Sequence, residues 1–222
     1  SNEVNYTFTM PSRDLVIEAR WKANEYEVTF DGNGGSSVNN QSVVYNNTYG
    51  TLPVPTKTGC LFAGWYLSET SNNGSGTKVT STSTVTTAGN HTLYARWAVV
   101  DLSRVEDKVY TGSQITQTVT VSLDGTTLVN GTDYEVSYSN NINVGEAEVI
   151  VTGKGNYTGE GRKTFTISKK EMTTEETDGE NATIEVSGIE NKMYTGEGIT
   201  QNVVVRDKTR GVNLVEGTDY EI

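Results

Sequence analysis

The chain contains one stretch of sequence twice. Residues 108–117 read KVYTGSQITQ, and residues 192–201 read KMYTGEGITQ. Each copy continues through a valine-rich segment to the phrase GTDYE, at residues 131–135 and again at 217–221. The copies lie 84 residues apart at their first tyrosine and 86 at their second, so the later copy is two residues longer between the phrases. Matches on both sides of a length change indicate one fold present twice, with a variable loop inside it. A chain of such repeats is first of all a spacer or a scaffold.

A different repeat occupies the first half of the chain. The phrase EARW at residues 18–21 returns as YARW at residues 94–97, which is 76 residues later. Residues 1–22 are therefore interpreted as the C-terminal tail of a preceding repeat, and residues 23–98 as a complete one. Apolar and polar residues alternate on both sides of Pro11, which predicts two strands in the tail.

Strands are also predicted through the rest of the chain, because apolar and polar residues alternate with a period of two. The alternating segments are residues 26–30, 41–45, 92–97, 134–138, 147–151 and 165–167. Residues 98–101 are predicted to be a short link. Short strands separated by turn signals predict a β-sandwich over residues 99–168. Residues 169–182 are predicted to be a polar linker, and residues 183–222 an incomplete second copy.

Composition excludes several classes of protein. A net charge of −11 argues against a nucleic-acid partner, since phosphate binding needs clustered Lys and Arg. Cys60 is the single cysteine, so no disulfide can form within the chain. No apolar run approaches the roughly 20 residues that span a bilayer. The chain is therefore expected to rely on several small hydrophobic cores.

The motifs of the complete repeat are characteristic. They are VTFD at residues 28–31, GG at 34–35, LPVPTK at 52–57, FAGWY at 62–66 and TLYARW at 92–97. This ordered set resembles the Listeria–Bacteroides repeat, a family that includes the B repeat of internalin-type surface proteins. The resemblance implies a small β-grasp-like module that occurs in tandem on bacterial surface proteins. Cys60 departs from the family pattern, which usually has an aromatic residue after the glycine.

The second half of the chain has a resemblance of its own. The phrases YSNNINVGEA at residues 138–147 and GKGNYTG at 153–159 are similar to the Ig-like repeats of large bacterial surface proteins. The resemblance covers residues 101–168, and residues 183–222 for the second copy. The predicted fold class is therefore mainly β, with tandem small modules in which a β-grasp-like repeat is followed by Ig-like β-sandwich repeats.

Two glycine-rich segments could be mistaken for ligand sites. The sequence DGNGG at residues 31–35 invites a calcium interpretation, but an EF-hand loop would need glycine and glutamate where Ser36 and Ser42 stand. The sequence GKGN at residues 153–156 lacks the Gly-Lys-Ser/Thr ending of a phosphate-binding loop. Both segments are predicted to be turns.

Few residues offer catalytic chemistry. His91, the single histidine, is predicted to be an exposed turn residue, and Cys60 a half-buried packing residue. Together they provide too few ligands for a zinc site and no triad. Asp133 and Asp219 supply one carboxylate per repeat, whereas a glycosidase needs two across a cleft. Each is therefore predicted to make a turn hydrogen bond or to lie at a solvated strand end.

Aromatic residues are the remaining candidates for a binding surface. Trp65 and Tyr66 could form a sugar-stacking platform, but a small β module needs aromatic side chains for its core, and Trp65 is assigned to it. Three tyrosines expected to be exposed are the better binding candidates: Tyr45, Tyr49 and Tyr157. The tryptophans that end the ARW phrases, Trp21 and Trp97, are expected to pack on the junction with the following module.

The sequence thus predicts no catalytic, cofactor-binding or metal-binding residue. It indicates a non-catalytic repeat region of a secreted or cell-surface bacterial protein, acting as a stalk or as adhesive modules. The alternative is a carbohydrate- or host-protein-binding module of an extracellular enzyme or adhesin. A further partner is expected for residues 183–222, because a half sandwich leaves strand edges that recruit another strand.

Overall fold

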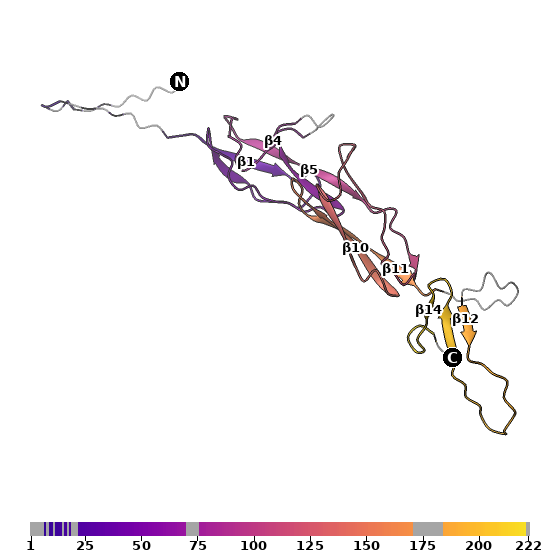
Figure 1. The fold of residues 1–222 in the computed structure, drawn as a ribbon. Helices are drawn as coiled ribbons and strands as arrows, with labels where there is room; N and C mark the ends of the chain where they lie inside the picture. Colours follow the sequence, from indigo (N-terminus) through magenta and orange to yellow (C-terminus); the bar gives the residue numbers. More distant parts are fainter. Residues whose placement is uncertain are drawn as a thin grey trace. The chain divides into compact units, whose positions relative to one another are not determined.

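The computed structural model describes residues 7, 9–10, 12–14, 16, 18, 22–69, 76–170 and 184–220. These residues form strands and turns, with no helix in the described part of the chain (Figure 1), and the prediction of a mainly β fold is confirmed. The two strands predicted on either side of Pro11 fall mostly on residues outside the described ranges.

The chain divides into two compact units. The first is made of Ser1–Glu106, Thr116–Ser139 and Glu148–Phe165, and the second of Asp107–Ile115, Asn140–Ala147 and Thr166–Ile222. The strands β10 and β11 contribute residues to both units.

The first sheet is built mainly from residues 25–101. Its strands are β1 (Glu25–Asp31), β2 (Gln41–Val44), β3 (Cys60–Tyr66), β4 (Lys78–Val79) and β5 (His91–Asp101). They lie in the order β2-β1-β5-β3-β4, with β1 parallel to β5 and the other neighbours antiparallel. The segment between β2 and β3 stays irregular, because each of its prolines pushes the preceding residue toward extended geometry.

One face of this sheet carries the first hydrophobic core. Val28, Leu93 and Ala95 are completely buried there, while the neighbouring Glu27 and Thr29 on β1 are exposed. This is the alternation expected of strands with one covered face. Trp65 lies in the same cluster, and its ring centroid is 4.7 Å from that of Phe30.

The strand β5 continues beyond the first repeat. Residues Val99, Val100 and Asp101 pair antiparallel with β7 (Thr120–Leu123), which forms a hairpin with β8 (Thr126–Thr127). The predicted link at residues 98–101 is therefore wrong, since these residues are the last four of β5. Ala98 and Val100 are buried while Val99 is 54% exposed, so the period of two continues without a break.

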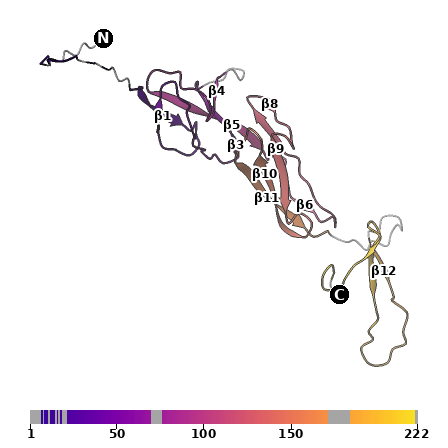
Figure 2. The same ribbon diagram turned by 60° about the vertical axis from the view of Figure 1, so that its left-hand side comes forward.

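A second sheet holds most of the remaining strands. It consists of β6 (Lys108–Val109), β9 (Tyr134–Ser139), β10 (Gly145–Gly153) and β11 (Glu160–Ser168). Their order is β6-β11-β10-β9, and Figure 2 shows β9, β10 and β11 side by side. The residues predicted to alternate do so, because Val149 and Val151 are fully buried and the intervening Ile150 is only partly covered.

A third sheet belongs to the second unit. The strands β12 (Ile184–Ser187), β13 (Val204–Asp207) and β14 (Val212–Asn213) pair antiparallel in that order with β13 in the centre. Val205 is its buried apolar residue, at 6% exposure.

The repeated GTDYE phrase forms the same turn in both copies. The Asp133 carboxylate accepts a hydrogen bond from the Val129 amide at 2.9 Å, and the Asp219 carboxylate accepts one from the Val215 amide at 2.9 Å. Each aspartate also donates its own amide to the same valine's carbonyl at 2.8 Å. Of the two roles predicted for these aspartates, a turn hydrogen bond or a solvated strand end, the structure shows the turn hydrogen bond in both copies.

Candidate functional site at the module junction

The end of the first repeat and the segment that follows it share one hydrophobic core. Leu61 and Ala98, from β3 and β5 of the first repeat, are completely buried in it. Their partners from the following segment are buried residues on the two sheets: Val100, Val121, Tyr134 and Val151. Because this junction core, as we name it, draws on both segments, neither can move away from the other without exposing it to water.

Backbone hydrogen bonds cross the same junction. Phe62 on β3 and Thr158, which precedes β11, exchange a pair of them at 2.8 and 3.0 Å. The Val100 amide donates to the carbonyl of Gly59 at 3.0 Å. A Cβ placed on Gly161 would lie 3.2 Å from the Val100 side chain, so β11 approaches β5 closely there. The junction is therefore a paired and packed interface.

A buried arginine adds a polar contact between the two segments. The Arg96 side chain is 7% exposed, and its guanidinium carbon lies 3.9 Å from the ring centroid of Tyr66. Its Nη1 is 3.7 Å from a carboxylate oxygen of Asp124, in the β7–β8 turn. Among the described residues, its Nε and Nη2 have no hydrogen-bond partner. Sequence reasoning missed Arg96, although the ARW phrase that contains it occurs twice in the chain.

The environment of Tyr66 follows from this contact. Burial raises the pKa of the Tyr66 phenol, and the positive charge of Arg96 partly opposes that rise. With 9% exposure and a guanidinium against its ring, Tyr66 cannot offer an open stacking face. Trp65 is 1% exposed and donates its indole N–H to the Pro53 carbonyl at 2.7 Å. The assignment of Trp65 to the core is confirmed.

Trp97 packs within its own repeat, so the expectation that it lies on the junction is wrong. Its indole N–H donates to the Gly32 carbonyl at 2.9 Å, and its ring centroid is 5.4 Å from that of Phe62. A Cβ on Gly35 would lie 2.4 Å from its ring, so the glycine makes room for it. Trp97 therefore holds the turn after β1 against β5. Trp21, for which the same position was expected, lies outside the described residues.

The three tyrosines expected to be exposed are all covered to some degree. Tyr49 is 3% exposed, and burial raises its pKa. Tyr45 is half-buried. Tyr157 is half-buried beside the junction core, where burial is the main cause of its raised pKa. The expected exposure is therefore wrong for Tyr49, whose side chain lies in the first hydrophobic core. Tyr45 and Tyr157 are half-buried, and their role in binding stays a prediction.

His91 differs from its prediction as an exposed turn residue. It is half-buried at the start of β5, with Nδ1 2.9 Å from the Gly89 carbonyl and Nε2 2.8 Å from the Tyr49 hydroxyl. Because a carbonyl only accepts, Nδ1 carries a proton and a neutral ring would accept from Tyr49. Cys60 pairs with Val99, eight residues farther along β5, so about 26 Å separates the cysteine from the histidine. They cannot act as nucleophile and base.

The turns predicted at the two glycine-rich segments are present. Asn33 donates its amide to the Asp31 carboxylate at 2.8 Å, and Gly35 donates to the Gly32 carbonyl at 2.9 Å. At the other segment, Gly155 adopts a φ of 63° and Tyr157 donates its amide back to Lys154 at 3.2 Å. No group of three His, Cys, Asp or Glu side chains suited to a metal ion occurs in the described ranges.

A shallow hollow of about 490 Å³ lies beside the first of these turns. Its lining includes Asp31, Thr92 and Tyr94. In register, Asp31 on β1 lies next to Tyr94 on β5, which lies next to Tyr66 on β3. Tyr94 is half-exposed between the fully buried Leu93 and Ala95, so its side chain is on the outer face. Sequence reasoning did not select Tyr94, although its place in the alternating strand indicates this face.

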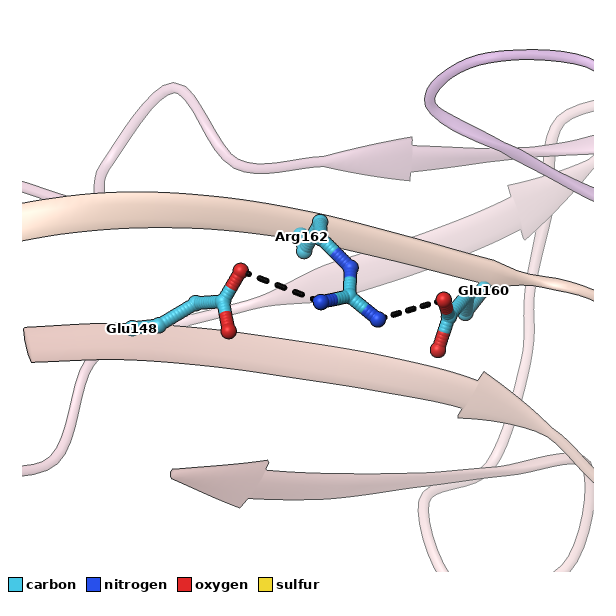
Figure 3. Close-up of polar contacts among 3 residues, drawn as sticks. All are labelled: Glu148, Glu160 and Arg162. Carbon is cyan, nitrogen blue, oxygen red and sulfur yellow. Dashed lines mark hydrogen bonds and ion pairs between the residues drawn. The ribbon is translucent and has the colours of Figure 1, made fainter. Parts of the chain in front are cut away.

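A charged cluster marks the outer face of the second sheet. Figure 3 shows the guanidinium of Arg162 between the carboxylates of Glu148 and Glu160. The Nη1–Glu148 distance is 3.4 Å. Glu160 is the main cause of the raised pKa of Arg162. Because Arg162 and Glu160, two residues apart on β11, are both about half exposed, their ion pair is solvated and contributes little to stability.

Comparison with known proteins identifies the first complete repeat. Residues 26–96 match the family described as the Listeria-Bacteroides repeat domain. Residues 26–96 are a Listeria–Bacteroides repeat. The matched range ends inside β5, so the strand that carries the junction begins in the Listeria–Bacteroides repeat and ends beyond it.

Two relatives place the repeat in larger proteins. A protein of Evansella cellulosilytica named "Putative Gly-rich membrane protein" is 36% identical over 107 residues, which is 48% of this chain and 12% of that protein. Internalin H of Listeria monocytogenes is 34% identical over 120 residues, which is 54% of this chain and 20% of internalin H. The similarity therefore spans a fifth or less of either relative. No solved structure matches the chain significantly, and the described residues include no helix that could cross a membrane.

Proposed function

We propose that this chain is a non-catalytic, stiff spacer segment of a secreted or cell-surface bacterial protein. The observation that carries the proposal is the junction, where β5 pairs with strands of both segments and Leu61 is buried against the following one. The similarity to internalin H and to a protein named as a membrane protein supports a surface location.

Stiffness follows from what bending would disrupt. Opening the junction would break the backbone pairing of Phe62 with Thr158 and of β5 with β7. Each such hydrogen bond contributes about 0.5–1.5 kcal/mol net. Opening the junction would also expose Leu61 and Val121 to water. Full burial of an apolar side chain of this kind contributes about 1.5–3 kcal/mol. These terms favour a junction that stays closed under thermal motion.

We also propose that residues 99–168 form an Ig-like β-sandwich repeat and that residues 183–222 are an incomplete second one. Two sheets meet across the junction core, which is the layer arrangement of a sandwich. The identical turns at Asp133 and Asp219 support the same fold in both copies.

The experiment is a distance measurement between spin labels across the junction. Labels at Asn24→Cys and Asn156→Cys, both exposed, in a Cys60→Ser background should give a narrow distance distribution. The matched control inserts two glycines between Val100 and Asp101, which should broaden the distribution. A distribution in the parent chain as broad as that of the insertion variant would contradict the spacer proposal.

A glycan-binding module is the second candidate, and the hollow beside Tyr94 favours it. Aromatic rings next to carboxylate and hydroxyl groups, such as Asp31 and Thr92, provide both an apolar face and hydrogen-bond partners for a sugar. A glycan array with the parent chain and with Tyr94→Ala tests this idea. Saturable binding that the substitution removes would favour a binding module, whereas equal signals from both proteins would count against it.

A further inference from the structure

The turn that follows the valine-rich strand differs between the two copies of the second repeat. In the first copy, β7 and β8 are joined by two residues, Asp124-Gly125. In the second copy, β13 and β14 are joined by the four residues 208–211. The two extra residues of the later copy are therefore in this turn, which carries two cations, Lys208 and Arg210, where the first copy has an aspartate.

The shorter turn places a carboxylate beside the buried Arg96. Asp124 and Gly125 have φ values of 49° and 79°, the positive values that a two-residue hairpin turn requires. The Asp124 carboxylate thereby lies 3.7 Å from Nη1 of Arg96, whose side chain is 7% exposed. Because Nε and Nη2 of Arg96 have no hydrogen-bond partner among the described residues, the buried charge depends on Asp124 for compensation.

The longer turn contacts the first copy of the same repeat, within the second compact unit. The Nη2 of Arg210 donates to the Gly112 carbonyl at 3.4 Å, and its guanidinium carbon lies 5.7 Å from the ring centroid of Tyr110. A Cβ added to Gly112, whose φ is 72°, would collide with this guanidinium, so the glycine leaves room for it. The contacted residues belong to the repeated phrase KVYTG.

The two turns are not interchangeable, because their charges are opposite. Cations at the position of Asp124 would place like charges next to the buried guanidinium of Arg96, which a desolvated site penalises strongly. A carboxylate at the position of Arg210 could not donate to the Gly112 carbonyl, and it would lack the positive charge that the face of an aromatic ring attracts. Each turn therefore suits one neighbour and disfavours the other.

We propose that this hairpin turn selects the module that precedes its repeat in the chain. A two-residue turn with an aspartate accepts a Listeria–Bacteroides repeat through the arginine of the ARW phrase. A four-residue turn with an arginine accepts another copy of its own repeat through the YTG phrase. The inference rests on the proposed spacer function, in which the modules are joined in a fixed order by closed junctions.

The first test is a double-mutant cycle by urea unfolding of the full chain. Asp124→Asn removes the charge but keeps the side-chain shape and tolerates the positive φ, and it should raise the unfolding equilibrium constant about tenfold. In an Arg96→Met background the same substitution should change this constant by less than about threefold, because no buried cation is left to compensate. The matched control is Glu146→Gln, an exposed carboxylate of the same segment, which should also stay within about threefold.

The second test exchanges and probes the turns. Replacing Asp124-Gly125 by the Lys-Thr-Arg-Gly sequence of the second copy should raise the unfolding constant about a hundredfold and broaden the spin-label distance distribution across the junction. In the ¹⁵N-labelled chain, Arg210→Ala should shift the amide signal of Ser113, whose peptide group contains the Gly112 carbonyl. Thr209→Ala, in the same turn, should leave that signal unchanged.

Three results would overturn the proposal. They are an equal effect of Asp124→Asn in both backgrounds, an exchanged turn that costs no more than Asp124→Asn, and an unshifted Ser113 signal in Arg210→Ala. Any of them together with a narrow distance distribution in the parent chain would refute the selection of neighbours and leave the spacer function standing. A broad distribution in the parent chain would refute both.

Discussion

Replacing Leu61 by alanine tests whether the Listeria–Bacteroides repeat and the following segment share one core. Leu61 lies in the first repeat by sequence, yet its side chain is completely buried in the junction core. The substitution removes three carbons, which corresponds to about 2.4 kcal/mol at roughly 0.8 kcal/mol per buried methylene. The remaining cavity raises the expected loss of unfolding free energy to about 3 kcal/mol, within the range for buried leucines. For a unit of this size the melting temperature should fall by about 6–12 °C.

The assay is unfolding in urea, monitored by the hydrogen exchange of backbone amides in two strands. Amides of β1 report on the Listeria–Bacteroides repeat, and amides of β10 report on the following segment. Both should lose the same stability in Leu61→Ala, because one cooperative unit opens as a whole. Val54→Ala is the control, since Val54 is 60% exposed and its loss should change stability by less than about 0.5 kcal/mol.

The reasoning would be refuted by a difference between the two probes. If β1 lost about 3 kcal/mol while β10 kept its stability, the segments would fold independently and the junction would be a contact of little weight. A loss of unfolding free energy below about 1 kcal/mol at both probes would also contradict it, because replacing a fully buried leucine by alanine costs about 2–5 kcal/mol.

Three further changes have defined outcomes. Gly35→Ala should displace the ring of Trp97, because the new Cβ would lie 2.4 Å from it, and tryptophan fluorescence should shift to the red. Asp133→Ala and Asp219→Ala should each cost about 1 kcal/mol in urea unfolding, since each removes the same 2.9 Å hydrogen bond to a valine amide. Burial raises the pKa of Tyr49 above 10.0, so its contribution to stability is present below pH 10.0 and is lost as the pH rises through the folded-state pKa. Tyr49→Phe should therefore make the alkaline loss of stability less steep, which urea unfolding on either side of pH 10.0 would show.

Some features of the fold follow from local sequence. The alternation around Val28 and around Val149 places every second side chain on one face, and both segments are strands with that face buried. The GTDYE turn also depends on neighbours alone, because the Asp133 carboxylate binds an amide four residues away. A hydrogen bond of such short range forms in the same way in either copy.

Other features depended on contacts between distant residues. Nothing near Val100 in the sequence indicates that it pairs with Val121. The short apolar run at residues 98–100 is equally compatible with a link and with the end of a strand. The burial of Arg96 follows from Tyr66 and Asp124, which come from other strands and turns.

The sequence alone therefore determined strands such as β1 and β10, the GTDYE turns and the resemblance of residues 26–96 to the Listeria–Bacteroides repeat. The tertiary structure decided that β5 continues through residues 98–101 to pair with β7, and it also decided which aromatic side chains are covered. The physical reason is that strand pairing and burial are settled by competition among segments far apart in the chain, whereas alternation and turn hydrogen bonds are settled within a few residues.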